Sequence, residues 1–209
     1  MGLSGAKPAV TPLELNQKLT SLEYDKGIGS KVSDPLIDAT CYQKLIGKLL
    51  CLTATKPDIS YAVQILSQFM QTPTRSHMDA ATRVVRYLKQ APGMGVIMRR
   101  GPADALTGFC DSDWAACPIS RRSVSGYLVK FGDSLISWRS KKQHIVARSS
   151  AEAEYKSMAS AVAEIVWLRG LFAELGTQFI NQSSYFQIVK QPSKSLLTPS
   201  FMSAQSTLK

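Results

Sequence analysis

Apolar residues follow a helical period over the first half of the chain, after an N-terminal arm. Residues 1–36 are rich in Gly, Pro, Ser and Lys without a sustained apolar period, so we expect an extended arm. Residues 37–93 predict a small helical segment of three amphipathic helices. Their apolar stripes are Tyr42, Leu45, Ile46, Leu49 and Leu52, then Ile59, Ala62, Val63, Leu66, Phe69 and Met70, then Ala81, Val84, Val85 and Leu88.

From residue 94 the period shortens to two, which is typical of β-strands. Strands are expected at residues 95–98, 106–110, 123–129, 135–138 and 144–147. A long helix follows from Ala151 to about Gly176, in which Met158, Val162, Ile165, Leu168 and Phe172 share one face. The chain is therefore expected to be α+β, with helices first, then antiparallel strands at 94–176 closed by one long helix.

Residues 177–209 break this pattern. They are rich in Ser, Gln, Thr and Pro and contain no Asp or Glu, the last acidic residue being Glu174. We expect a disordered or out-of-frame tail. Without further strands for the long helix to cover, Val162, Ile165 and Phe172 are expected to lie exposed, which favours aggregation.

The charge changes the picture, because a net charge of +10 and a pI near 9.6 indicate a polyanionic partner, foremost nucleic acid. No apolar run approaches the roughly 18–20 residues of a membrane span, and no secretory signal is evident, so we expect an intracellular protein of the cytoplasm or nucleus. The four cysteines form no CxxC pair, and only two histidines are present, which argues against a structural zinc site.

Two acidic pairs are candidates for chemistry. Asp111 and Asp113 come at the end of an expected strand, and Glu152 and Glu154 lie in the first turn of the long helix. Each pair also has a purely structural explanation. Asp111 and Asp113 fit a turn, and Glu152 and Glu154 fit charges that stabilise the helix dipole.

Basic residues cluster at Arg121 and Arg122, and again at Arg139, Lys141 and Lys142 beside Trp138. Cations next to an aromatic ring suit a phosphate backbone with a nearby base or sugar. Alternatively, these cations only form a solvated face of a strand. The net charge of +10 favours nucleic-acid binding over this alternative.

Four blocks in this order and spacing resemble the ribonuclease H domain of copia-type long-terminal-repeat retrotransposons. The blocks are residues 111–115 (DSDWA), 121–127 (RRSVSGY), 136–143 (ISWRSKKQ) and 149–155 (SSAEAEY). Upstream, residues 42–47 (YQKLIG) and 56–62 (KPDISYA) resemble the end of the family's reverse transcriptase and its connection to that domain. The resemblance covers roughly residues 2–176.

The resemblance implies a ribonuclease H-like fold, with three antiparallel strands, a helix, then parallel strands. It implies two-metal hydrolysis of the RNA strand in an RNA–DNA hybrid, with Mg²⁺ or Mn²⁺ held by four carboxylates. Asp111 and Glu154 match the first two carboxylates, and Asp113 and Glu152 are the second choice in each pair. The family's third carboxylate lies on the strand after the long helix, in a Cys-Asp-Asn type motif, and the fourth lies further on. No acidic residue follows Glu174, and no Tyr-Val-Asp-Asp polymerase motif occurs.

The sequence therefore predicts a remnant of a retrotransposon ribonuclease H domain that lacks two metal ligands and is inactive. The alternatives are a non-catalytic basic nucleic-acid-binding protein and a non-functional pseudogene product. The tail suggests a frameshift. When the third base of each codon from Phe201 to Lys209 is read with the first two bases of the next, the junctions permit His-Glu-Arg-Thr-Lys-His-Ile-Glu, a block of the kind this family carries near that point.

Overall fold

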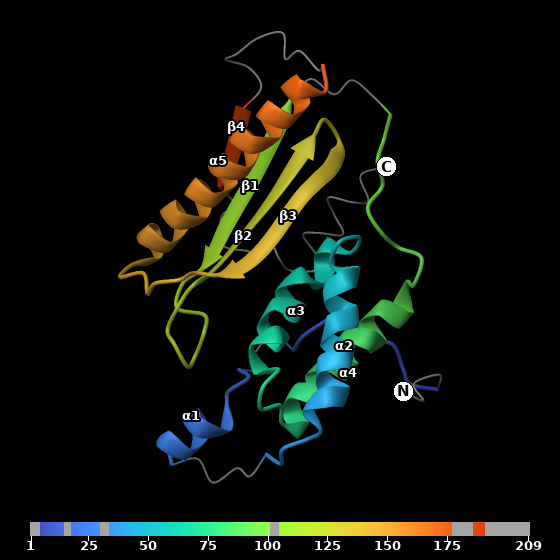
Figure 1. Cartoon of the computed structure of the whole chain (residues 1–209), viewed down its shortest axis with the longest axis vertical. Coiled ribbons are helices and arrows are strands. Elements are labelled where there is room, and N and C mark those ends of the chain that lie inside the picture. Colours follow the sequence, from blue (N-terminus) through green and yellow to red (C-terminus); the bar gives the residue numbers. More distant parts are fainter. Residues whose placement is uncertain (1–4, 15–17, 30–33, 101–104, 177–185, 191–209) are drawn as a thin grey trace. The chain divides into compact units, whose positions relative to one another are not determined.

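The computed structural model describes residues 5–14, 18–29, 34–100 and 105–176, together with the backbone of residues 186–190 (Figure 1). The chain divides into two compact units. The first contains residues 1–95 and 118–120, and the second contains residues 96–117 and 121–209. In the described part of the chain, no helix is long and apolar enough to cross a membrane.

The first unit is helical. Its helices are α1 (Leu22–Gly27), α2 (Ala39–Leu52), α3 (Ser60–Leu66) and α4 (Arg75–Gln90), and short 3-10 turns, η1 (Pro57–Ile59) and η2 (Ser67–Phe69), flank α3. Asp38 caps α2 by accepting a hydrogen bond from the backbone N–H of Thr40 at 2.9 Å. The three expected helical segments are confirmed, the second as η1, α3 and η2 in succession.

The predicted apolar stripes form the core of this unit. Its fully buried side chains include Tyr42, Ile46, Leu49, Ile59, Val63, Leu66 and Val84. Leu52 does not belong to it: the residue is 38% exposed because it ends α2 on the solvent side.

The N-terminal residues are more ordered than an extended arm. They include α1, and the buried side chain of Leu19 packs into the helical core. The N–H of Ala9 donates to the carbonyl of Arg86 in α4 at 3.2 Å, and Arg83 of α4 forms a 2.9 Å ion pair with Glu14. Part of this segment is therefore attached to α4 by backbone and side-chain contacts that composition does not reveal.

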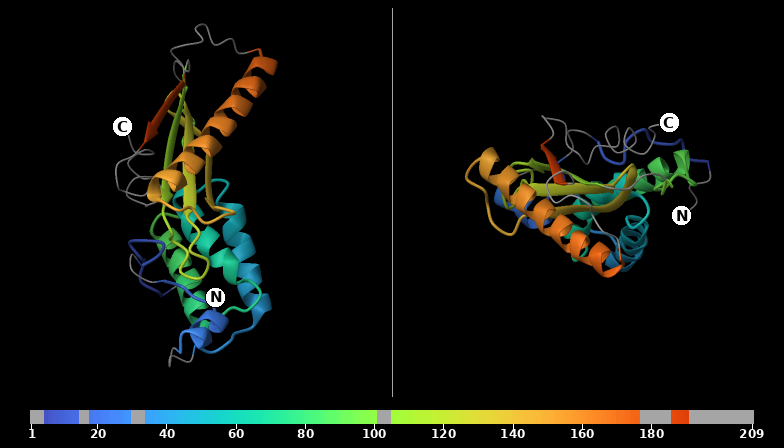
Figure 2. Two further views of the ribbon diagram at one scale, coloured as in Figure 1. Left: turned by 90° about the vertical axis from the view of Figure 1, so that its left-hand side faces the viewer. Right: turned by 90° about the horizontal axis from the view of Figure 1, so that it is seen from above.

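The second unit contains a four-stranded sheet and one long helix. The strands are β1 (Leu106–Asp113), β2 (Val124–Phe131), β3 (Ser134–Lys142) and β4 (Phe186–Lys190), and the order across the sheet is β3-β2-β1-β4. β1, β2 and β3 are antiparallel neighbours, whereas β4 pairs parallel to β1. The helix α5 (Ser150–Glu174) lies across one face of this sheet (Figure 2). The predicted α+β class is confirmed.

The apolar face of α5 is covered by the sheet. Ile165 is fully buried with Cys110 and Val129, and the ring of Phe172 stacks on Phe131 with centroids 4.7 Å apart. The expectation that Ile165 and Phe172 lie exposed is therefore wrong, and Val162 is half-buried. The reason is that β1 and β2 supply enough surface to cover this helix.

Two strand predictions and one part of the tail prediction need correction. Residues 95–98 and 144–147 form no strand, since neither has a partner strand, and Ile145 and Val146 are 61% and 51% exposed. Conversely, residues 186–190, which were expected to belong to the tail, form the strand β4. They do so because the outer edge of β1 offers free hydrogen-bonding groups. The predictions for residues 177–185 and 191–209 lie outside the described residues.

Candidate functional site

Asp111 and Asp113 lie within the last part of β1, not beyond its end. Neighbouring residues on a strand face opposite sides of the sheet. Cys110 packs in the core beneath α5, and Ser112 on the same side approaches the amide of Gln143 at 3.4 Å. Asp111 and Asp113 therefore occupy the face of β1 that points away from α5, where both are half-buried.

A serine of α5 fixes the backbone at Asp111. The buried hydroxyl of Ser157 lies 2.6 Å from the carbonyl oxygen of Asp111 and 3.1 Å from that of Gly126, which is paired with Asp111 across the two strands. Glu154 lies one helical turn before Ser157 on α5. Hence Ser157 ties the strand that carries Asp111 to the helical turn that carries Glu154.

The two helix glutamates have different environments. Glu152 accepts hydrogen bonds from the backbone N–H of Arg148 at 2.7 Å and from the Lys156 amine at 2.6 Å, while Ser149 caps the N–H of Glu152. The hydrogen bond from Lys156, followed by that from Arg148, lowers the pKa of Glu152. The carboxylate of Glu152 is therefore engaged in hydrogen bonds at the start of the helix.

The acidic residues do not gather into a metal centre. Across the ranges that the structure describes, no three His, Cys, Asp or Glu side chains lie together in a group able to hold an ion. Magnesium prefers several hard oxygen ligands, and two ions close together need carboxylates to offset their mutual repulsion. The two-magnesium centre implied by the family resemblance does not fit the carboxylates that the described residues provide.

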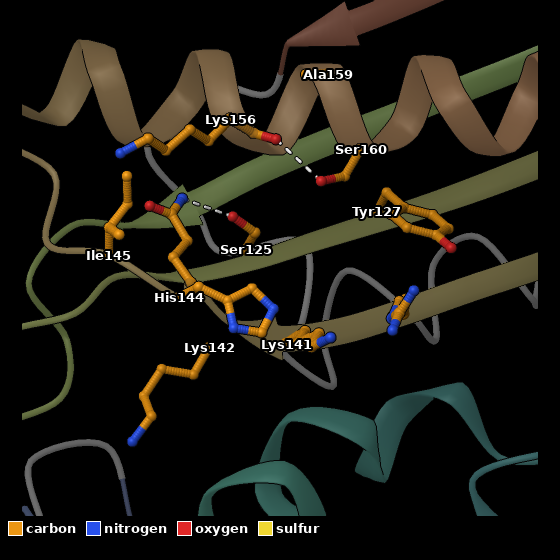
Figure 3. Close-up of a pocket in the computed structure, with 11 residues that line it drawn as sticks. Ser125, Tyr127, Lys141, Lys142, His144, Ile145, Lys156, Ala159 and Ser160 are labelled. Atoms are coloured by element: carbon orange, nitrogen blue, oxygen red, sulfur yellow. Dashed lines mark hydrogen bonds between the residues drawn. The ribbon is translucent and has the colours of Figure 1, made fainter.

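The basic residues of β3 form a clearer site. Strand pairing sets Arg139 beside Tyr127 and Lys141 beside Ser125. These side chains line a hollow of about 400 Å³ together with residues of α5 and of the segment after β3 (Figure 3). Its lining consists of Ser125, Tyr127, Arg139, Lys141, Lys142, Gln143, His144, Ile145, Lys156, Ala159 and Ser160.

The other predicted nucleic-acid contacts lie elsewhere in this unit. Trp138 pairs with Leu128 and, by strand alternation, occupies the face opposite Arg139, so it does not line the hollow. Arg121 and Arg122 belong to the loop between β1 and β2, where the Arg121 N–H donates to the Cys117 carbonyl at 2.8 Å. The predicted basic set is thus divided among two faces and a loop.

Gln143 is a residue whose role the sequence did not reveal. Its buried side-chain amide donates to the Ser125 hydroxyl at 2.7 Å and to the carbonyl of Ala153 in α5 at 2.9 Å, and its backbone N–H donates to the Ser123 carbonyl at 2.8 Å. It therefore fastens the end of β3 to β2 and to α5. A glutamine directly after a run of basic strand residues is the available signal, and it is a weak one.

Comparison with known proteins finds retrotransposon relatives. The chain is 43% identical over 171 residues, 82% of its length, to the retrovirus-related Pol polyprotein from transposon RE1 of Arabidopsis thaliana. It is also 43% identical over 173 residues to the corresponding polyprotein from transposon RE2 of the same plant. The chain is similar over most of its length to a segment of the Pol polyproteins of copia-type retrotransposons. It spans only 11% of the length of each of these Pol relatives.

The chain also matches a much shorter protein. The chain is 44% identical over 128 residues to the secreted RxLR effector protein 161 of Plasmopara viticola, which covers 61% of this chain and 90% of that protein. No protein-family model matches the chain. No solved structure matches it either.

Proposed function

We propose that this Pol segment is a ribonuclease H-derived domain that binds RNA–DNA hybrid without cutting it efficiently. The observation that carries the proposal is the topology of the sheet, in which three antiparallel strands are followed by α5 and then by β4, parallel to β1. This is the succession of elements that the resemblance to the ribonuclease H domain implies. The relatives' names support the retrotransposon origin.

The carboxylates support the inactive form of this proposal. By the sequence resemblance, Asp111 and Glu154 match the first two carboxylates of the family. Ser157 links the two elements that carry them. No acidic residue follows Glu174 in the sequence, so β4 carries none. Two carboxylates do not readily hold two magnesium ions against the repulsion between the cations.

The basic surface supports binding. The net charge is +10, and β3 presents Arg139, Lys141 and Lys142 within its last four residues. Phosphate contacts made by such residues release condensed counterions, so the affinity for nucleic acid falls as salt rises.

Fluorescence anisotropy of a labelled RNA–DNA hybrid, titrated with the full chain at several salt concentrations, tests this proposal. We expect binding that weakens steeply with salt and is retained by Asp111→Asn, because the removed carboxylate repels phosphate and does not anchor it. The proposal fails if the chain does not bind the hybrid at low salt, or if its affinity does not respond to salt.

A further inference from the structure

The hollow between β3 and α5 is formed by two elements that meet at the sheet edge. Lys141, from β3, and Ser125, from β2, are paired across the strands, and Gln143 ties both strands to α5. Lys156, Ala159 and Ser160 of α5 provide the opposite wall (Figure 3). The hollow therefore has a rigid frame.

Cations predominate around it. Its described lining contains four cationic side chains, those of Arg139, Lys141, Lys142 and Lys156, and no Asp or Glu. Glu164 lies next to this lining, because its carboxylate interacts with Tyr127 and accepts a hydrogen bond from Ser137 at 2.7 Å, and the Lys142 amine lies 3.8 Å from the Cys117 sulfur. Lys156 is offset by its 2.6 Å ion pair with Glu152. Lys141 is exposed and makes no ion pair with another described residue. Cationic groups therefore outnumber the carboxylates Glu152 and Glu164 around the hollow, which favours an anion.

The uncharged lining narrows the class of anion. Ser125 supplies a hydroxyl group able to donate a hydrogen bond to a phosphate oxygen, and His144 supplies an exposed imidazole. The hydroxyl of Ser160 donates to the Lys156 carbonyl at 3.0 Å. Ile145, which is 61% exposed, adds apolar surface of the kind that packs against a sugar or base. A volume of about 400 Å³ is at the lower end of small-ligand sites, which suits a nucleotide unit better than a bare ion.

We propose that this hollow binds a phosphate group, with its attached sugar, of a nucleic-acid strand. The inference rests on the proposed nucleic-acid binding and assigns it a location. Lys156 and Ser160, which line the hollow, follow Glu152 at intervals of one helical turn, whereas Glu154 lies on a different side of α5. The hollow thus anchors a strand separately from Asp111 and Glu154.

One matched pair of variants tests the assignment through the α5 wall. Ala159 lines the hollow, whereas Ala163, one turn further along the same helix, is also exposed but does not line it. Ala159→Glu and Ala163→Glu change the net charge by the same amount. They also change the helix propensity by the same amount, because both replace Ala by Glu. We expect Ala159→Glu to weaken hybrid binding by about tenfold or more, and Ala163→Glu by no more than about twofold.

A second pair tests the β3 wall. Lys141→Gln removes a cation from the hollow, and Lys48→Gln removes one from the exposed face of α2 in the other unit. The slope of log affinity against log salt should become shallower by about 1 for Lys141→Gln and stay unchanged for Lys48→Gln.

His144 offers a direct readout, because the chain has only one other histidine, His77, in the first unit. On addition of a labelled single-stranded oligonucleotide, the imidazole NMR signals of His144 should shift while those of His77 stay in place. Inorganic phosphate at the same phosphate concentration should not reproduce the shift; if it does, the hollow is a free-anion site and the strand assignment is overturned.

The outcomes separate the two proposals. If the wild-type chain binds no nucleic acid, the proposed function fails, and this inference fails with it. If the chain binds but Ala159→Glu and Lys141→Gln behave as their controls do, only the location is wrong.

Discussion

The hydroxyl of Ser157 lies 2.6 Å from the backbone carbonyl oxygen of Asp111. This contact joins the middle of the sheet to the first third of α5, and the Ser157 side chain is fully buried. It holds the strand that carries one candidate carboxylate at a fixed place relative to the turn that carries the other, Glu154. Its role is positional, since Ser157 acts through the backbone and not through a carboxylate.

Replacement of this serine should destabilise the second unit. Ser157→Ala leaves the Asp111 carbonyl without its side-chain donor in a buried setting, which costs about 1–3 kcal/mol of unfolding free energy. Ser160→Ala is the control. Ser160 is exposed and donates only to the Lys156 carbonyl of its own helix, so the change should stay within about 0.5 kcal/mol. Urea unfolding monitored by circular dichroism measures both, and equal effects would refute the role given to Ser157.

Replacement of Gln143 should also lower the free energy of unfolding, as replacement of Ser157 should. Gln143→Ala removes hydrogen bonds to Ser125 and to the Ala153 carbonyl, and it opens a space where β3 meets α5. We expect a loss of about 2–3 kcal/mol in urea unfolding. Gln43→Ala removes one exposed hydrogen bond, to the Met70 carbonyl at 2.9 Å, and should cost under about 1 kcal/mol. If Gln143→Ala lowers the free energy of unfolding no more than Gln43→Ala does, the hydrogen bonds from Gln143 to Ser125 and Ala153 do not stabilise the second unit.

The first unit should lose stability in mild acid because of His77. Its ring is buried, stacks on Phe69 with centroids 3.9 Å apart, and accepts a hydrogen bond from the Thr74 N–H at 3.0 Å. Burial lowers the pKa of His77 below the ordinary value of 6.5, although nearby Asp34 opposes part of that change. Between the lowered folded-state pKa and 6.5 the unfolded chain binds more protons than the folded chain.

Neutral His77 contributes to the free energy of unfolding in full above pH 6.5. This contribution is lost as the pH falls from 6.5 through the lowered folded-state pKa. Urea unfolding of the wild-type chain between pH 8 and about 5 should show this decline. His77→Gln cannot titrate, so it should remove the decline in this window, whereas His144→Gln, at an exposed position, should leave it unchanged. An equal decline in His77→Gln would exclude His77 as its cause.

The coding DNA tests the origin of the tail. The family's third carboxylate is expected on the strand after the long helix, which is β4 here. Read in the alternate frame, the junction of the codons for Gln187 and Ile188 permits aspartate, and it lies in the same frame as the His-Glu-Arg-Thr block at residues 201–205. We therefore expect an aspartate codon at this junction and an open frame onward to that block. A stop codon between them would contradict the frameshift.

Much of the fold was predictable because its signals are local. Helical periodicity marks α2, α4 and α5, and alternation marks β2 and β3. The errors at residues 95–98, 144–147 and 186–190 have one common cause. Whether an extended segment becomes a strand depends on a free sheet edge elsewhere, and the segment's own residues do not report that.

The candidate site was predictable in its residues but not in its arrangement. Acidic and basic blocks mark Asp111, Glu154, Arg139 and Lys141. The sequence does not show that Lys156 reaches the same hollow as Arg139 and Lys141, because that depends on how α5 crosses the sheet.

Cleavage of an RNA–DNA hybrid with labelled RNA tests the central claim most directly. The wild-type chain and Asp111→Asn are compared with Mg²⁺ and with Mn²⁺, at protein concentrations where anisotropy shows that the hybrid is bound. We predict that both proteins bind the hybrid and that neither cuts the RNA above background. Cleavage by the wild-type chain that disappears in Asp111→Asn would mean that the carboxylates present suffice to assemble the metal centre, and the account of an incomplete site would be wrong.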